Sequence, residues 1–356
     1  MATPSQLVGQ TISHYRVIEK LGGGGMGVGH RERHYKNEDI GMSDHGVNRP
    51  AQTGASKTRT ERQARTPVLD IAYEVSGPAD GSPVLLLHGW PDDVRTWDRM
   101  LPALHTAGQR TFVPWLRGFG GTRFLDSRTM RSGQLTALGQ DVLDFIDSIG
   151  LRSLAVVGHD WGARAAYIAS CLAPERVTHC VALSVGWGTN NPDQVLSLRQ
   201  TQNYWYHWYM ALDRGEQLVR NDRRAFTRYI WTIWNPNWPI SDTEFEETAR
   251  AFENPDWADV VLHSYRVRWG LAPVDPAYEP LEARLRTDPS ISVPTLVIHG
   301  GGDPCNDPST SEGKEKFFVG LYRRVVLDGV GHFPQREHPE GVCKALLPFL
   351  LEGRRP

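Results

Sequence analysis

An aspartate occupies the place from which a catalytic side chain would be presented. The apolar run Leu154–Val157 leads into Gly158-His-Asp-Trp-Gly162, and a helix is expected from Ala163. A strand, a sharp turn flanked by glycines and a helix are typical of a nucleophile elbow, which usually carries serine but here carries Asp160. The alternative is a glycine-rich turn in which Asp160 only caps the following helix.

Two further side chains can complete a catalytic set with Asp160. Asp303 follows the apolar run Thr295–Ile298, and His332 follows the last predicted strand. Because the carboxyl ends of parallel strands meet at one edge of a sheet, we expect Asp160, Asp303 and His332 to act as nucleophile, acid and base. Asp307 is an alternative acid. A turn-forming aspartate and a surface histidine are the non-catalytic alternatives.

A loop near the start of the chain supplies the fourth part of the predicted site. His88-Gly-Trp-Pro91 directly follows the apolar run Pro83–Leu87. We expect the backbone N–H groups of Trp90 and Trp161 to form an oxyanion hole, since backbone donors near a nucleophile commonly stabilise the developing oxyanion.

The type of nucleophile selects the reaction. Serine that attacks an sp³ carbon leaves an ether, which water does not readily cleave. A carboxylate that attacks the same carbon leaves an ester, which a histidine-activated water can hydrolyse. The residues therefore predict displacement at an alkyl carbon, and both epoxides and alkyl halides fit. Neither reaction requires a metal ion or an organic cofactor.

The elements that must position these residues alternate between strands and helices. Strands are predicted at Val68–Val75, Pro83–Leu87, Thr111–Val113, Leu154–Val157, Val177–Val185, Thr295–Ile298 and Arg324–Leu327, and helices near Trp97–Leu104, over Leu135–Ile149, from Ala163 and around His338–Leu351. Short apolar strands that alternate with helices predict an α/β fold with a mostly parallel, doubly wound sheet.

A long insertion interrupts this alternation. Residues 187–287 hold eight of the twelve tryptophans and have the pattern of several amphipathic helices. A segment of this length is too long for a loop, so we expect an inserted helical cap subdomain. A cap over the carboxyl ends of the strands would enclose an aromatic, largely apolar pocket.

Composition and charge narrow the class of protein. Hydrophobic residues make up 40% of the chain, charged residues 22%, and the net charge is −2. These values predict a packed core and give no reason to expect nucleic acid or an anionic membrane as a partner. The chain has no run of 18 apolar residues and no N-terminal signal core, and its four cysteines lack metal-site spacing. We therefore expect a soluble, cytoplasmic protein.

The first 66 residues differ from the rest. They contain ten Lys and Arg against six Asp and Glu, and residues 41–66 have almost no large apolar side chains. Such a segment cannot offset its ordering entropy by burial, which predicts a linker. We expect the core to comprise residues 67–186 and 288–356 around the cap, and we expect removal of residues 1–66 to leave activity largely intact.

Residues 67–352 resemble the α/β-hydrolase fold family and, within it, the soluble epoxide hydrolases. The motifs that carry the resemblance are His88-Gly-Trp-Pro91, Arg117-Gly-Phe-Gly120, Gly158-His-Asp-Trp-Gly162, Gly302-Asp303 and Gly331-His332. The resemblance implies an aspartate nucleophile with the order of triad residues described above. It also implies two cap tyrosines that act as acids.

Two positions match the implied tyrosines. Tyr206 lies in a short aromatic segment early in the cap, and Tyr265 lies in a Tyr-Arg pair late in the cap. Tyr204 and Tyr209 compete for the first position, and aromatic packing of the cap is the non-catalytic alternative. Four residues are expected to bind the substrate: Trp90, Trp161, Trp205 and Tyr209.

Together these features predict a bacterial detoxification enzyme, a monomer or homodimer, that converts a small apolar epoxide and water into a vicinal diol. An opening epoxide develops an alkoxide that needs a proton, which two phenols supply, whereas a departing halide needs only weak donors such as indoles. A haloalkane dehalogenase with the same nucleophile is the nearest alternative, although such enzymes commonly have Asn where Trp90 stands. A non-catalytic binding protein of the same fold is more remote.

Residues 7–28 carry a separate resemblance. They are similar to the opening of bacterial serine/threonine protein kinases, including the glycine-rich loop Gly22–Gly27. None of the later kinase motifs follows in the chain. We therefore interpret the segment as a kinase-like fragment and do not expect it to bind ATP.

Overall fold

The computed structural model describes residues 11–12, 15–24, 27–34, 59–188 and 194–352, and the chain divides into two units, Met1–Ala55 and Ser56–Pro356. In the first unit, strands β1 (Thr11–Ile12), β2 (Tyr15–Gly24) and β3 (Gly27–His34) form an antiparallel sheet. The kinase-like segment thus includes a strand pair, which the sequence analysis did not predict. Most of the predicted linker lies outside the described residues.

The second unit is built on a nine-stranded sheet in the order β12-β11-β10-β9-β6-β7-β5-β4, with β8 paired to β5. The strands are β4 (Thr60–Arg65), β5 (Leu69–Ser76), β6 (Ser82–Leu87), β7 (Gln109–Pro114), β8 (Arg123–Phe124), β9 (Leu154–His159), β10 (Val177–Leu183), β11 (Thr295–Gly300) and β12 (Tyr322–Leu327). Neighbours from β12 to β7 are parallel, and β5 is antiparallel to its neighbours. The predicted mostly parallel sheet is confirmed.

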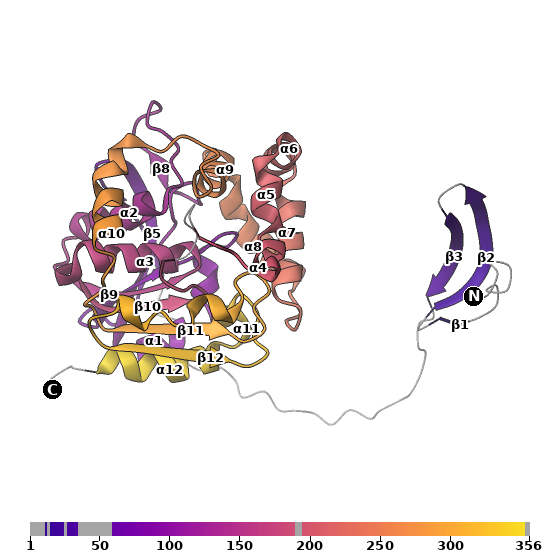
Figure 1. Ribbon diagram of the computed structural model, residues 1–356. Helices are drawn as coiled ribbons and strands as arrows, with labels where there is room; N and C mark the ends of the chain where they lie inside the picture. The colour runs from indigo at the N-terminus through magenta and orange to yellow at the C-terminus, as the bar shows by residue number, and fades with distance from the viewer. Residues whose placement is uncertain (1–10, 13–14, 25–26, 35–58, 189–193, 353–356) are drawn as a thin grey trace, which may run out of the picture. The chain divides into compact units, whose positions relative to one another are not determined.

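Helices cover both faces of this sheet (Figure 1). They are α1 (Leu101–Thr106), α2 (Leu135–Ser148), α3 (Trp161–Leu172), α11 (Pro334–Glu337) and α12 (Pro339–Leu351). Successive strand residues point to opposite faces, so Val84 and Leu86 of β6 pack in the core that includes α1 and α12. Leu85 and Leu87 pack in the core that includes α2 and α3. Two-sided burial explains the continuous apolar runs of the strands.

The insertion between β10 and β11 is helical, as predicted. It contains α4 (Leu198–Asn203), α5 (Trp205–Ala211), α6 (Asp213–Asn221), α7 (Arg223–Trp234), α8 (Asp242–Ala249), α9 (Trp257–Val267) and α10 (Glu279–Thr287). Helices α5 to α9 lie together on one side of the core (Figure 1). Helix α10 instead packs against α3, so the chain has returned to the core before residue 287.

Strand β4 corrects the expected boundary at residue 67. All six of its residues pair antiparallel with β5, from Thr60 opposite Val75 to Arg65 opposite Asp70. Only Ala64 is buried, and the rest of the strand is polar or charged. Charged side chains are usual on an edge strand, where they discourage pairing with other molecules. This composition is why the segment resembled a linker in the sequence.

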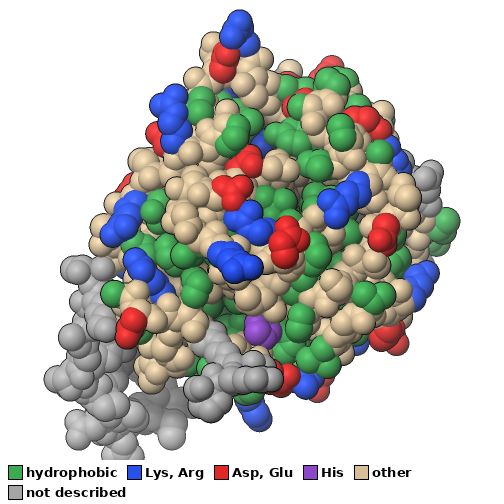
Figure 2. Space-filling view, turned by 90° about the vertical axis from the view of Figure 1, so that its left-hand side faces the viewer, with side chains coloured by type: hydrophobic (Ala, Val, Ile, Leu, Met, Phe, Trp, Pro, Cys, Tyr) green, Lys and Arg blue, Asp and Glu red, His purple; other side chains and the backbone are tan. Residues whose placement is uncertain are grey.

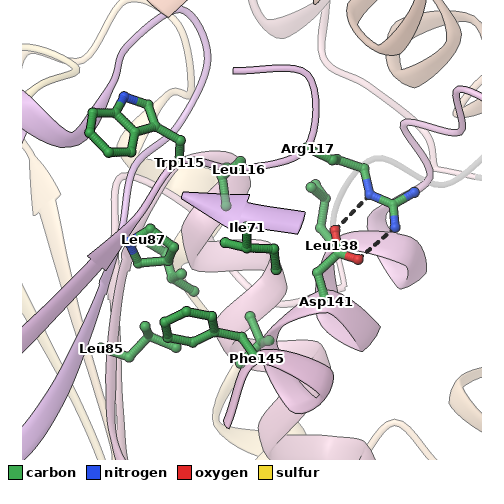
Figure 3. Close-up of a pocket in the computed structure, with 11 residues that line it drawn as sticks. Ile71, Leu85, Leu87, Trp115, Leu116, Arg117, Leu138, Asp141 and Phe145 are labelled. Carbon is green, nitrogen blue, oxygen red and sulfur yellow. Dashed lines mark hydrogen bonds and ion pairs between the residues drawn. The ribbon is translucent and has the colours of Figure 1, made fainter. Parts of the chain in front are cut away.

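A buried ion pair anchors the loop after β7 to α2. Arg117 donates from Nε and Nη2 to the two carboxylate oxygens of Asp141, at 2.6 and 2.7 Å. Beside this pair lies a cavity of about 20 Å³, lined mainly by apolar side chains such as Leu85, Leu87 and Phe145 (Figure 3). The cavity has room for about one water molecule. Its lining contains none of the predicted catalytic residues, so this cavity is not the predicted site.

The surface of the second unit mixes charge types. On the face shown in Figure 2, basic, acidic and hydrophobic side chains alternate, and no single charge dominates. This matches the near-zero net charge of the chain. Among the described residues, no helix has both the length and the apolar character needed to cross a bilayer.

Candidate active site

Asp160 occupies a sharp turn between β9 and α3. Its backbone has φ 49° and ψ −110°, a conformation that residues other than glycine rarely adopt. The turn is tight because a Cβ on Gly158 would lie 2.1 Å from the carbonyl oxygen of Gly162, and one on Gly162 would lie 2.3 Å from that of Leu87. The Asp160 side chain makes no capping hydrogen bond to α3. The turn therefore presents the carboxylate instead of using it as a helix cap.

The carboxylate of Asp160 is buried and faces two other parts of the predicted site. Its Oδ1 accepts a hydrogen bond from the backbone N–H of Trp90 at 3.0 Å, and its Oδ2 lies 3.8 Å from Nε2 of His332. Burial alone would raise the pKa of Asp160, but the nearby His332 outweighs it and holds the pKa well below its usual value. Asp160 is therefore ionised at neutral pH, as a nucleophile must be.

His332 is oriented by Asp303. Its Nδ1 lies 2.8 Å from Oδ2 of Asp303, while Oδ1 of Asp303 accepts hydrogen bonds from the backbone N–H groups of Cys305 and Asn306. Burial raises the pKa of Asp303, but the charge of His332 and hydrogen bonds from His299 and His332 lower it to about 2. Burial lowers the pKa of His332, but the charge of Asp303 raises it well above its usual value.

Asp307, the alternative acid, lies elsewhere. Its carboxylate accepts a hydrogen bond from the backbone N–H of Ser309 at 3.0 Å and pairs with Arg199 at 3.1 Å. It thus caps the short 3-10 helix Pro308–Ser311. Of the two aspartates, Asp303 is the one that contacts the histidine.

The backbone of His332 is fixed at both ends of the residue. Its N–H donates to the carbonyl oxygen of Trp234 at 3.0 Å, in the last turn of α7. Its carbonyl oxygen accepts from Oγ of Ser184 at 2.9 Å and lies 2.8 Å from Nε2 of His159. The cap and the core together therefore hold the loop that carries the imidazole.

Arg336 links three pieces of chain around the site. Its buried guanidinium pairs with Asp92, which follows the Trp90 loop, with 3.1 Å between Nε and Oδ2. The same group pairs with Glu244 of α8 at 3.0 Å. Arg336 itself belongs to α11, directly after His332 and Phe333. The side chain of Arg336 thus connects the loop that carries Trp90, the cap, and the loop that carries His332.

Both predicted cap tyrosines lie at the site. Tyr206 of α5 and Tyr265 of α9 are buried, and their ring centroids are 5.3 Å apart. The Trp90 ring stacks on Tyr206 at 5.5 Å and meets the edge of Tyr265 at 5.0 Å. Burial raises the pKa of both phenols well above the usual value. Both are therefore protonated at neutral pH and can donate hydrogen bonds.

The competing aromatic residues are engaged elsewhere. The Tyr204 hydroxyl donates to Oδ1 of Asn306 at 2.7 Å. Trp205 and Tyr209 contact each other and Phe226 of α7. The two share a face because they are four residues apart, whereas Tyr206 is rotated by about 100° around the helix. Trp205 also meets Tyr206 at 6.3 Å, but among the described ring contacts neither Trp205 nor Tyr209 meets Trp90 or Tyr265, and their substrate contacts stay a prediction.

Trp161, predicted to bind the substrate, contacts one of the cap tyrosines, because its Nε1 donates to the hydroxyl oxygen of Tyr265 at 3.1 Å. The sequence analysis did not identify Trp234 as a residue of the site. Trp234 contacts the rings of Trp90, Tyr206 and His332, with centroids 5.7, 5.1 and 4.7 Å apart. The three-residue spacing of Trp231 and Trp234 on an amphipathic helix was the available signal.

Three buried side chains at the site have atoms of metal-binding type close together. Potential ligand atoms of Asp303, Cys305 and His332 lie within 4.8 Å of one another. Both oxygens of Asp303 already accept hydrogen bonds, and one of them orients His332. A metal ion bound here would replace the contact that orients the imidazole, so the cluster is better explained by the aspartate–histidine pair.

Comparisons with known proteins agree with this geometry. The sequence profile of the alpha/beta hydrolase fold matches residues 82–339. A crystal structure from Klebsiella pneumoniae, provisionally assigned as an epoxide hydrolase, has a TM-score of 0.77 and 36% identity over 82% of this chain and 97% of that one. Epoxide hydrolase 2 of Siraitia grosvenorii is 34% identical over 79% of this chain and 94% of that protein. Epoxide hydrolase A of Mycobacterium tuberculosis is 27% identical over 82% and 97%.

The profile match covers most of the second unit, including the helical insertion and parts of both core segments. The chain belongs to the α/β-hydrolase fold family and, within it, to the group of the epoxide hydrolases. The resemblance given by the sequence motifs is thereby confirmed.

Proposed function

We propose that this protein hydrolyses a small epoxide to a vicinal diol through an alkyl ester on Asp160. The observation that carries the proposal is the arrangement of three groups around one carboxylate. Asp160 lies beside a backbone donor from Trp90 and an imidazole paired with Asp303, and a pair of buried phenols packs against the ring of the same Trp90. A nucleophile, an activated water and an acid for an alkoxide are the three requirements of this reaction.

Ring opening is the first step. The phenols of Tyr206 and Tyr265 donate hydrogen bonds to the epoxide oxygen while Asp160 attacks one ring carbon. The new ester C–O bond forms as the epoxide C–O bond breaks, and a phenol proton passes to the alkoxide. Oδ2 of Asp160 suits this attack, since Oδ1 is held in a hydrogen bond by Trp90, whereas Oδ2 lies 3.8 Å from Nε2 of His332, beyond hydrogen-bond distance.

Ester hydrolysis is the second step. His332 removes a proton from water, and the hydroxide adds to the ester carbonyl carbon. The oxyanion is the former Oδ1, which already accepts from Trp90, and the Trp161 backbone N–H is the proposed second donor. The intermediate collapses, the diol oxygen takes the proton from His332, and the proton of the restored carboxyl group returns to the phenolate. Water and epoxide are thus consumed in equal amounts.

The dehalogenase alternative is less well supported. A departing halide would need a free indole N–H close to the nucleophile. The indole of Trp161 donates to Tyr265, but the indole N–H groups of Trp90 and Trp234 have no hydrogen-bond partner among the described residues, so the indoles do not decide between the two reactions. The paired phenols have no function in halide release but suit an epoxide oxygen.

A single-turnover experiment with styrene oxide in ¹⁸O-labelled water tests the proposal. Water attacks the ester carbonyl, so the first turnover should place the label in the Asp160 carboxylate, and the diol should carry the unlabelled oxygen of Asp160. Mass spectrometry of the diol and of the Asp160 peptide reads both positions. Label that enters the diol in the first turnover would mean direct attack of water and would refute the ester route. Chloride release from a chloroalkane without any diol would favour the dehalogenase.

The N-terminal unit is proposed to be dispensable for catalysis, but the dispensable part is shorter than the sequence suggested. We expect removal of residues 1–55 to leave kcat/KM with styrene oxide and the thermal midpoint close to those of the full chain. Removal of residues 1–66 should also remove β4, expose the edge of β5 and lower the thermal midpoint by about 5 °C or more. Equal melting of the two truncated proteins would show that β4 does not stabilise the sheet.

The compartment and assembly remain proposals. We infer a reducing compartment such as the bacterial cytoplasm, which is supported by four unpaired cysteines, three of them buried. The substrate is a small molecule that fits among the aromatic rings of the site, and water is the second substrate. A monomer or homodimer stays the prediction for the assembly.

A further inference from the structure

Arg268 is a buried cation without a carboxylate partner. It directly follows α9, and only 6% of its surface is exposed. Within the described residues its guanidinium makes one hydrogen bond, from Nη2 to Oγ of Ser264 at 2.8 Å, and Nε has no partner. No carboxylate in the described chain lies within ion-pair distance of it. Burying an uncompensated charge costs several kcal/mol, so a function for this group is worth seeking.

The guanidinium lies over the ring of Tyr265. Its central carbon is 4.6 Å from the Tyr265 ring centroid and 5.5 Å from that of Trp161. Helical side chains lean toward the N-terminus, so Arg268 reaches the residues three and four positions before it, Tyr265 and Ser264. A cation over an aromatic face is attracted by the ring, and this attraction strengthens when the ring carries negative charge. Arg268 thus lies where a phenolate on Tyr265 would form.

The two cap tyrosines differ in their surroundings. Several titratable and charged side chains surround Tyr265. They are Tyr206 and His207 of α5, Asp160 in the turn before α3, Cys305 in the loop that carries Asp303, and Arg268. Burial and the charges of Asp160 and Cys305 raise the pKa of Tyr265, and Arg268 and the hydrogen bond from Trp161 oppose that rise. Around Tyr206, the charges of Cys305, Tyr265, Asp160 and Tyr204 all raise the pKa further.

The Trp161 hydrogen bond adds a geometric difference. Its indole N–H occupies one lone pair of the Tyr265 oxygen at 3.1 Å, so the Tyr265 proton must point away from the indole. The Tyr206 hydroxyl instead has the thiol of Cys305 at 3.5 Å, an exchangeable donor or acceptor. The hydroxyl of Tyr265 is therefore the better fixed of the two proton donors.

We propose that Tyr265 transfers the proton to the epoxide oxygen, that Tyr206 contributes a hydrogen bond only, and that Arg268 is a positioning residue that stabilises the phenolate left on Tyr265. This inference rests on the proposed epoxide hydrolysis. In the step, the O–H bond of Tyr265 breaks and its proton joins the epoxide oxygen, while the epoxide C–O bond breaks as Asp160 forms the new bond to carbon. The negative charge passes from Asp160 to Tyr265, directly under the guanidinium.

The test is a double-mutant cycle on the single-turnover rate of ring opening with styrene oxide. Arg268→Met should slow ring opening about tenfold, equivalent to about 1.4 kcal/mol of transition-state stabilisation. The same substitution should cost about tenfold in a Tyr206→Phe background but almost nothing in a Tyr265→Phe background, because no phenolate forms there. Arg268→Lys should recover most of the lost rate, since an ammonium retains the charge.

A matched control lies two residues away. Arg266 pairs with Glu216 at 2.7 Å and donates to the carbonyl oxygen of Met210, so Arg266→Met removes a cation from the same part of the chain without touching Tyr265. Its ring-opening rate should stay within about twofold of the unmodified protein. Thermal melting of every variant checks the fold, and if Arg268→Met fails to fold, Arg268→Gln and Arg268→Lys complete the cycle.

The outcomes separate the two proposals. Equal losses in the Tyr206→Phe and Tyr265→Phe backgrounds would overturn the role of Arg268 and leave it as a structural residue at the end of α9. If Arg268→Met slowed ring opening tenfold only in the Tyr265→Phe background, the roles of the two tyrosines would be exchanged. This result would also overturn the inference. Failure of the unmodified protein to form diol would instead refute the proposed function itself.

Discussion

Replacement of Asp160 with alanine is expected to reduce turnover of styrene oxide by at least about 10⁴-fold. Without the carboxylate no ester can form, and the remaining groups can only polarise the epoxide or activate water. Steady-state diol formation and the mass of the intact protein after a single turnover measure the two consequences. The variant should neither turn over nor gain the mass of the substrate.

Asp307 offers the matched control. It is an aspartate close to the triad in sequence, but its carboxylate caps a 3-10 helix and pairs with Arg199. Asp307→Ala should therefore retain near-normal kcat. Alanine at position 160 keeps the strained backbone that aspartate already accepts, so the two variants should melt at similar temperatures. Substantial turnover by a folded Asp160→Ala protein would contradict the covalent mechanism.

His332→Gln is expected to separate the two chemical steps. Asp160 and the tyrosines remain, so ring opening should still consume about one epoxide per protein molecule. The ester should then persist because no base activates water, and steady-state turnover should fall by about 10³-fold or more. Intact-protein mass spectrometry should show one added substrate, located on the peptide that contains Asp160.

His338→Gln is the control for the loss of an imidazole close to His332 in sequence. The side chain of His338 is half exposed, and the residue lies between α11 and α12. Its turnover should be unchanged. A folded His332→Gln protein that forms diol at a normal rate would exclude His332 as the base. One that never forms the adduct would show that the histidine is also needed for ring opening.

The charges explain why His332 can serve the second step. In the free protein, Asp303 and Asp160 both favour the imidazolium form and hold the pKa of His332 high. Formation of the ester neutralises Asp160, so one of these two contributions disappears, the pKa of His332 falls, and the imidazolium releases its proton to solvent before it accepts one from water. The intermediate thereby makes the imidazole a better base at the moment when water must be activated.

The sequence predicted the elements of the sheet well because their burial leaves a clear pattern. Apolar runs such as Leu154–Val157 correspond to strands buried on both faces, and the period of Leu135–Ile149 matches α2. Strand β4 gave no such signal, since a charged edge strand has the composition of a loop. Its presence depends on pairing with β5, a contact that local sequence does not encode.

The site residues that directly follow strands could be predicted from sequence motifs, whereas those on the cap helices were harder to predict. Asp160, Asp303 and His332 follow strands, and parallel strands bring such residues together. The cap positions depend on helix rotation. One step along α5 separates Tyr206, which faces the site, from Trp205, which packs on α7. Aromatic residues at every position of that segment obscured the direction in which each ring points.

The place of the cap in the chain has a consequence for how this protein can change. Strands β10 and β11 are parallel neighbours in the sheet, although more than a hundred residues separate them in sequence. The register of the sheet therefore does not depend on the length of the intervening helices. Descendants of this gene can lengthen, shorten or exchange those helices, and so acquire new substrates, while the carboxylate, its imidazole and its backbone donor keep the same geometry.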